Sequence, residues 1–222
     1  MSTIRVVLVD DQAVARRGLR AILEADGDIE VVGEAADGRS GVDTARRERP
    51  DVVLMDVRMP FMDGLEATRL LAGEDVDDPL DVLVVTTFDL DEYVFTALRE
   101  GAAGFLLKDT EPDRLIAAVR TVAAGDGLVA PEVTRRLIAE FARTRVAPVQ
   151  APPGFEELTD RERDVLLAVA EGLTNQEIAT RLFLGETTVK THLSSLLRKL
   201  DLRDRVQAVI YAYEHGLVRP TP

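Results

Sequence analysis

Cysteine and tryptophan are absent from this chain of 222 residues, and aromatic residues make up only 5% of it. Without cysteine no disulfide can form. The absence of cysteine is compatible with an oxidising or a reducing compartment and does not distinguish between them. No apolar run approaches the roughly 20 residues that span a bilayer. The opening residues, MSTIRVVLVDDQ, contain no charged-then-apolar leader. We therefore expect a cytoplasmic protein with no membrane partner.

Lysine is also scarce. Only three of the 27 basic residues are lysines, namely Lys108, Lys190 and Lys199. Lysine offers a point charge with three rotatable donors, a combination that arginine does not reproduce. A compositional bias toward arginine explains the scarcity, and the three lysines are either chance occurrences or functional residues.

Acidic residues are unevenly distributed. The net charge of −13 for the whole chain argues against nucleic-acid binding. Residues 1–125, however, hold 14 basic and 26 acidic residues, whereas residues 158–222 hold nine of each. The excess of acidic residues is confined to residues 1–125. The net charge of the whole chain therefore does not argue against nucleic-acid binding by the C-terminal part.

Short apolar runs alternate with helical patterns through the first 125 residues. Each apolar run is a predicted strand, and a predicted helix follows it. The five runs occupy residues 4–9, 29–35, 51–56, 81–87 and 104–109. Five strands interleaved with five helices predict an α/β domain, residues 1–125, with a parallel sheet and right-handed crossovers. Sites in such open sheets lie beyond the carboxyl ends of the strands.

The rest of the chain is predicted to be a linker followed by helices only. Residues 126–155 contain one amphipathic helical pattern (131–143) and a proline-rich stretch, which together predict a linker. Within residues 156–222, a short helix, a turn with glycine and a longer helix predict a helix-turn-helix. Capping-box patterns begin two of these helices, one formed by Thr159 with Glu162 and one by Thr174 with Glu177.

Polar residues follow four of the predicted strands. Asp10 and Asp11 end the first strand, Asp56 the third, Thr86 the fourth and Lys108 the fifth. Taken singly, each aspartate is explained by a helix cap or a solvated strand end, but together they predict one crevice. Three carboxylates repel one another unless a cation lies among them, and their oxygens suit Mg²⁺. Asp56, in the middle of the set, is the predicted nucleophile that accepts a phosphoryl group.

Four motifs resemble the receiver domain of two-component response regulators. They are VDD at 9–11, MDVRMPFMDG at 55–64, TTF at 86–88 and GFLLKD at 104–109. The resemblance covers about the first 125 residues and implies a flavodoxin-like fold in which a sensor histidine kinase phosphorylates Asp56. It also implies that Thr86 and Lys108 contact the phosphoryl group, and that Mg²⁺ is bound by Asp10, Asp11, Asp56 and the main-chain carbonyl of Arg58.

Two positions depart from the receiver pattern. Asp109 follows the lysine at a position where many receivers have proline. Phe105 occupies the position of the switch aromatic and lacks the hydroxyl group of a tyrosine. The resemblance implies that Thr86 and Phe105 form the switch.

The third helix of the tail carries small hydroxyl residues and basic residues on its outer faces. Between residues 187 and 205 there are five basic and two acidic residues, which predicts DNA contact through one helix. The stretches LTDRERDVL and EGLTNQEIATRLFLGETTVKTHLSSLLRKL resemble the LuxR-type DNA-binding domain, and the whole chain resembles NarL/FixJ response regulators. The resemblance implies base contacts by Lys190, Thr191 and Ser194, and phosphate contacts by Thr188, Asn175 and Lys199.

These features predict a transcription regulator that is switched by phosphorylation and binds two promoter half-sites as a homodimer. The receiver would assist its own phosphorylation and dephosphorylation without turning over a dedicated substrate. Two alternatives stay open: an aspartyl phosphatase or phosphotransferase, and a LuxR-type regulator that senses a ligand without phosphorylation. The sequence has no second acid or base near Asp56 and no phosphate-binding glycine–lysine loop, which counts against the enzyme. The acidic crevice counts against the ligand sensor.

Overall fold

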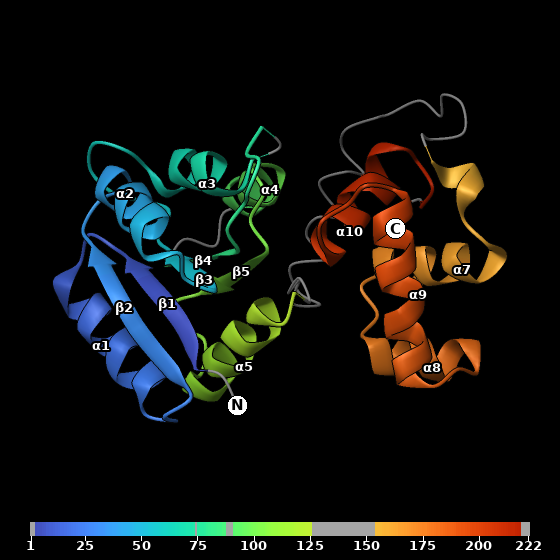
Figure 1. Cartoon of the computed structure of the whole chain (residues 1–222), viewed down its shortest axis with the longest axis horizontal. Coiled ribbons are helices and arrows are strands. Elements are labelled where there is room, and N and C mark those ends of the chain that lie inside the picture. Colours follow the sequence, from blue (N-terminus) through green and yellow to red (C-terminus); the bar gives the residue numbers. More distant parts are fainter. Residues whose placement is uncertain (1–2, 74, 88–90, 126–153, 219–222) are drawn as a thin grey trace. The chain divides into compact units, whose positions relative to one another are not determined.

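The chain folds into two compact units, residues 1–128 and residues 129–222 (Figure 1). Each unit has its own buried core. The computed structural model describes residues 3–73, 75–87, 91–125 and 154–218.

The first unit is built on a five-stranded parallel sheet with the strand order β2-β1-β3-β4-β5. Its strands are β1 (Ile4–Val9), β2 (Ile29–Ala35), β3 (Val52–Met55), β4 (Val82–Thr86) and β5 (Gly104–Leu107). The chain runs from β1 to β2 on one side and then crosses to β3 on the other. This reversal makes the carboxyl ends of β1 and β3 the switch point, where open sheets of this kind hold ligands. The predicted α/β class is confirmed.

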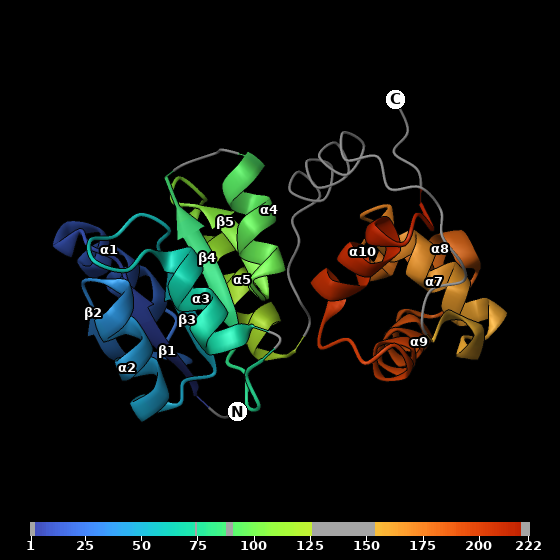
Figure 2. The same cartoon turned by 90° about the horizontal axis from the view of Figure 1, so that it is seen from above.

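Helices cover both faces of the sheet (Figures 1 and 2). They are α1 (Ala13–Glu24), α2 (Gly38–Glu48), α3 (Gly64–Ala72), α4 (Asp91–Arg99) and α5 (Pro112–Ala123). On one face α1 packs with α5, and on the other α3 packs with both α2 and α4.

Strand β3 shows why the central strands are apolar throughout. All four of its residues are buried. Leu54 lies in a core cluster with Leu8 of β1, Leu83 of β4 and Val119 of α5. Because successive side chains of a strand point to opposite faces, the neighbours of Leu54 face the other helical layer. A strand covered on both sides leaves no position where a polar side chain reaches water before the strand ends.

The second unit is helical throughout its described residues. Its elements are η1 (Phe155–Glu157), α7 (Asp160–Ala170), α8 (Asn175–Leu182), α9 (Glu186–Lys199) and α10 (Arg205–Glu214). α7 packs against α9 and α10, while α8 packs against α9. The predicted helix-turn-helix is confirmed as α8, a short turn and α9.

Local signals begin and end the helices of the second unit. Both predicted capping boxes are present, with Thr159 and Glu162 at the start of α7 and Thr174 and Glu177 at the start of α8. Phe183 ends α8 in the left-handed region, with φ of 57°. These signals set the length of α8 and the tight turn into α9.

The predicted linker helix (131–143) and nearly all of the predicted linker lie outside the described residues. Among the described residues, no helix is both long enough and apolar enough to cross a bilayer.

Candidate acidic site and nucleic-acid interface

The strand ends that carry the predicted site residues are joined through their backbones. The amide of Asp56, just after β3, donates to the carbonyl oxygen of Val9 at the end of β1 (2.8 Å). The amide of Lys108, just after β5, donates to the carbonyl oxygen of Thr86 at the end of β4 (2.9 Å). Parallel pairing thus brings residues from four strands to one edge of the sheet, as predicted.

Lys108 bridges two buried carboxylates at this edge. Its Nζ lies 2.5 Å from Oδ2 of Asp10 and 2.8 Å from Oδ2 of Asp56. The exposed fraction of the side chain is 11% for Lys108, 2% for Asp10 and 6% for Asp56. The other carboxylate oxygens accept backbone amides, Asp10 from Gln12 and Asp56 from Val57, both at 2.8 Å. Each buried carboxylate is therefore aimed into the crevice by its own loop.

Burial and charge act in opposite directions on this site. Burial raises the pKa of Asp56, and the hydrogen bond and charge of Lys108 offset only part of that rise. Burial by itself lowers the pKa of Lys108, but hydrogen bonds to Asp10 and Asp56 outweigh it, so the pKa of the ammonium group is raised. Lys108 consequently stays charged while it holds the two carboxylates together.

A third carboxylate completes the acidic cluster. Asp10, Asp11 and Asp56 each offer one oxygen, and these oxygens all lie within 4.8 Å of one another. Asp11 is exposed, whereas the other two are buried. When all three are ionised, Lys108 leaves two negative charges uncompensated. A small divalent cation with oxygen ligands fits this donor set and this charge.

The other residues predicted for the acidic site and its switch occupy different environments. Thr86 and Phe105 are both buried, with exposed fractions of 0% and 1%. Arg58 lies in the exposed loop after β3, and its guanidinium donates to the hydroxyl group of Tyr93 in α4 at 2.9 Å. This contact connects the loop that follows Asp56 to α4, and no sequence signal pointed to it.

Gly64, the first residue of α3, was not predicted to belong to the site. A Cβ atom at this position would lie 1.9 Å from the carbonyl oxygen of Asp56. The amide of Gly64 also donates to the carbonyl oxygen of Val57 at 2.8 Å. Asp63 caps α3 by accepting from the amide of Glu66. The glycine after this cap was the available signal for a close backbone approach.

Helix α9 presents polar residues on one side and an apolar seam on the other. Its buried residues are Val189, Leu193 and Leu196. The residues predicted to face bases or phosphates, Thr188, Lys190, Thr191 and Ser194, are all exposed. The hydroxyl group of Thr191 also donates to the carbonyl oxygen of Thr187 at 3.0 Å. The predicted DNA contacts on the exposed side of α9 are therefore three small hydroxyl side chains and one lysine.

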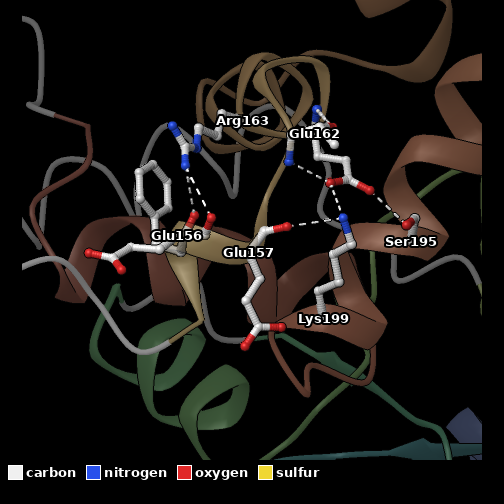
Figure 3. A network of polar contacts seen from close by, with 8 residues as sticks. Glu156, Glu157, Glu162, Arg163, Ser195 and Lys199 are labelled. Atoms are coloured by element: carbon white, nitrogen blue, oxygen red, sulfur yellow. Dashed lines mark hydrogen bonds and ion pairs between the residues drawn. The ribbon is translucent and has the colours of Figure 1, made fainter.

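Lys199, a predicted phosphate contact, takes part in a network inside the domain (Figure 3). Its Nζ lies 2.6 Å from Oε2 of Glu162 in α7 and donates to the carbonyl oxygen of Glu157 at 3.1 Å. The other oxygen of Glu162 accepts from the hydroxyl group of Ser195 at 2.7 Å. Burial raises the pKa of Glu162, but the hydrogen bonds from Lys199, Ser195 and Thr159 outweigh it and lower the pKa to about 2. The ammonium group of Lys199 thus joins α9 to α7 and η1.

Comparison with known proteins finds a family for each of the two units. Residues 6–120 match the response regulator receiver domain, and residues 156–212 match the bacterial regulatory proteins of the luxR family. The chain belongs to the two-component response regulators in which a receiver is joined to a LuxR-type DNA-binding domain.

Individual relatives share this organisation over almost their whole length. The transcriptional regulatory protein LiaR of Bacillus subtilis (strain 168) is 42% identical over 215 residues, which cover 97% of this chain and 99% of the relative. The response regulator protein VraR of Staphylococcus aureus (strain NCTC 8325 / PS 47) is 40% identical over 217 residues, covering 98% and 100%.

Solved structures show the same likeness. The crystal structure of the response regulator ChrA of a heme-sensing two-component system covers 98% of this chain and 100% of its own, with 38% identity and a TM-score of 0.53. The receiver domain of the putative response regulator NarL from Mycobacterium tuberculosis covers 56% of this chain and 99% of its own, with 38% identity and a TM-score of 0.54. The chain is a DNA-binding transcription regulator of the two-component type.

Proposed function

We propose that Asp56 is the residue that accepts the phosphoryl group. The observation that carries this proposal is the bridge of Lys108 Nζ to the buried carboxylates of Asp10 and Asp56, at 2.5 Å and 2.8 Å. A sensor histidine kinase would present a phosphohistidine, and an oxygen of Asp56 would attack its phosphorus. The P–N bond breaks, the imidazole nitrogen keeps the electron pair and takes up a proton, and Asp56 becomes an acyl phosphate.

The acidic cluster is the proposed Mg²⁺ site. Asp10, Asp11 and Asp56, together with the main-chain carbonyl of Arg58, would hold the ion, which would neutralise phosphoryl oxygens when bound. Support for this proposal comes from the three carboxylate oxygens within 4.8 Å of one another. Lys108 would turn from the carboxylates toward the phosphoryl group, and the buried hydroxyl of Thr86 would follow it, with Phe105 filling the space behind.

DNA binding is proposed to centre on α9, which would enter the major groove. Its exposed residues Lys190, Thr191 and Ser194 would contact base edges, and Thr188 and Asn175 would contact phosphates. We do not extend this proposal to Lys199, because its ammonium group is engaged with Glu162. Phosphorylation would favour a homodimer that places two such helices on successive half-sites.

The test compares phosphorylation with DNA binding in the full chain. With Mg²⁺ and acetyl phosphate, we expect the native chain to incorporate one phosphoryl group and to bind promoter DNA at least about fivefold more tightly. Asp56→Asn should take up no phosphate and should show no increase in DNA affinity. Asp63→Asn is the matched control, since asparagine also caps a helix and the cap to Glu66 survives.

Two results would contradict the proposal. An Asp56→Asn chain that responds as strongly as the native chain would place the acceptor elsewhere. Steady release of product from a diffusible phospho-substrate would instead support the aspartyl phosphatase.

A further inference from the structure

Arg205, the first residue of α10, reaches back to the start of α8. Its Nη1 atom donates to Oδ1 of Asn175 at 2.9 Å, and its Nη2 atom donates to the carbonyl oxygen of Leu173. Asn175 is the first residue of α8, the leading helix of the helix-turn-helix. One guanidinium therefore holds the side chain that begins α8 and the loop that precedes it.

The chemistry of the two groups determines which way the amide of Asn175 points. A guanidinium has only donors, so it can face only the oxygen of the amide. The NH₂ group of the amide is then directed away from Arg205, and it carries two donors. Both side chains are half-buried, so solvent or a ligand can reach the pair from outside. A pair of outward donors suits an acceptor such as a phosphate oxygen.

The only acidic side chain in the first turn of α8 is turned back onto the backbone. Glu177 accepts from the amide of Thr174 at 2.7 Å as part of the capping box. Hydrogen bonds to Thr174, and to a smaller degree the charge of Arg205, lower the pKa of Glu177. Arg205 thus orients a donor and offsets part of the negative charge that would repel a phosphate at the same place.

We propose that Arg205 is a positioning residue for DNA binding, which acts by holding the NH₂ group of Asn175 toward a backbone phosphate. The inference rests on the proposed DNA-binding function, and it assigns a role to a residue of α10, outside the helix-turn-helix. The first helix of such a motif crosses the DNA backbone while the second enters the groove, so the start of α8 is placed for a phosphate.

The first test separates DNA binding from folding by changing Asn175. Asn175→Asp keeps an oxygen for Arg205 and forms an ion pair with it, so the melting temperature should equal or exceed that of the native chain. The same change removes both donors and adds a negative charge. We expect affinity for a labelled mixed-sequence duplex to fall about tenfold or more, and Asn175→Ala to lower it about fivefold.

The second test asks whether Arg205 acts through Asn175. Arg205→Lys keeps the positive charge but loses the planar guanidinium that donates to both Asn175 Oδ1 and the carbonyl oxygen of Leu173. We expect the affinity for DNA to fall about fivefold. In an Asn175→Ala background, the same change at Arg205 should cause no further loss, because the amide that it orients is already gone. Arg203→Lys is the matched control, and it should bind DNA as the native chain does.

The outcomes distinguish this inference from the proposed function. If the native chain binds no duplex at any salt concentration, the proposed DNA-binding function is wrong, and the inference about Arg205 is wrong as well. If the native chain binds and Asn175→Asp binds equally well, the role of Asn175 is wrong. If losses from Asn175→Ala and Arg205→Lys multiply in the double variant, Arg205 does not act through Asn175. The Asn175 variants decide the matter even if Arg205→Lys fails to fold.

Discussion

At the scale of single residues, the placement of one lysine decides the state of the acidic crevice. Asp10 and Asp56 are buried and would repel each other, and Lys108 lies between them at 2.5 Å and 2.8 Å. Removing one member of a buried ion pair leaves the charge of its partner uncompensated. This lowers the free energy of unfolding by roughly 3–5 kcal/mol. An ion bound at the proposed Mg²⁺ site would also supply positive charge to these two carboxylates, so it would take over part of the role of Lys108.

Lys108→Met is expected to make the stability of the receiver depend on Mg²⁺. Without the ion, the melting temperature should fall below that of the native chain, because two buried carboxylates lose their counter-charge. Addition of Mg²⁺ should then raise the melting temperature more than it does in the native chain. Thermal unfolding at a series of Mg²⁺ concentrations measures this. Lys190→Met in α9 is the control, and the dependence of its melting temperature on Mg²⁺ should equal that of the native chain. If Lys108→Met shows the same Mg²⁺ dependence as Lys190→Met, Lys108 does not compensate the charge of the buried carboxylates.

Gly64 supports the same site through its lack of a side chain. A Cβ atom there would lie 1.9 Å from the carbonyl oxygen of Asp56, so Gly64→Ala must displace the loop that carries Asp56. We expect a loss of at least about 2 kcal/mol in the free energy of unfolding, with slower phosphorylation by acetyl phosphate. Gly18→Ala is the matched control. Apart from its chain neighbours and the backbone of α1 itself, no atom lies within 4 Å of the Cβ position of Gly18. The helix should therefore gain about 0.5–1 kcal/mol from the alanine.

At the scale of elements, Glu162 joins helices that are distant in the sequence. Its carboxylate lies in α7, and it accepts hydrogen bonds from Ser195 and Lys199 in α9 at 2.7 Å and 2.6 Å. The capping pattern of Thr159 with Glu162 was visible in the sequence, because the two residues are three positions apart. The ion pair with Lys199 was not visible, because 37 positions separate the partners and only packing of α7 on α9 brings them together.

This network predicts a dependence of stability on pH. The pKa of Glu162 is lowered from 4.5 to about 2 in the folded domain. A lowered pKa stabilises the folded state above the unfolded pKa, and that contribution disappears as the pH falls from about 4.5 toward about 2. At neutral pH we expect Glu162→Gln to unfold more easily than the native chain by roughly 2 kcal/mol.

The measurement is denaturant unfolding at several pH values, followed by NMR signals of α7 and α9. The difference between the native chain and Glu162→Gln should shrink as the pH drops below about 4.5. Glu156→Gln, at an exposed residue of η1, is the control and should differ little from the native chain at any pH. A difference that stays constant down to acid pH would mean that Glu162 does not act through its charge.

At the scale of the whole molecule, the two units carry different charge. Residues 1–125 hold 14 basic and 26 acidic residues, whereas residues 158–222 hold nine of each. A DNA-binding unit of zero net charge is thus tethered to a strongly acidic partner. Because DNA is a polyanion, the receiver should weaken association in the full chain by repulsion, and salt should screen this effect.

We therefore expect a fragment of residues 154–222 to bind mixed-sequence DNA more tightly than the unphosphorylated full chain at low salt. The ratio of the two affinities should approach one as ionic strength rises to about 0.1 M and beyond, where the screening length is about 10 Å. Fluorescence anisotropy with one labelled duplex measures both proteins. Equal affinity at the lowest salt concentration would show that the charge of the receiver has no influence on DNA binding.

The sequence by itself determined the order and type of the strands and α-helices that the structure describes, and it identified the strand ends that carry Asp10, Asp56 and Lys108. Strand runs, capping boxes and the handed crossover of parallel strands are local or general rules, so they can be read from neighbouring residues. Only the tertiary structure decided which partner each long side chain takes. Lys199 pairs with Glu162, and Arg205 with Asn175, because such side chains reach several groups and the packing of helices selects one of them.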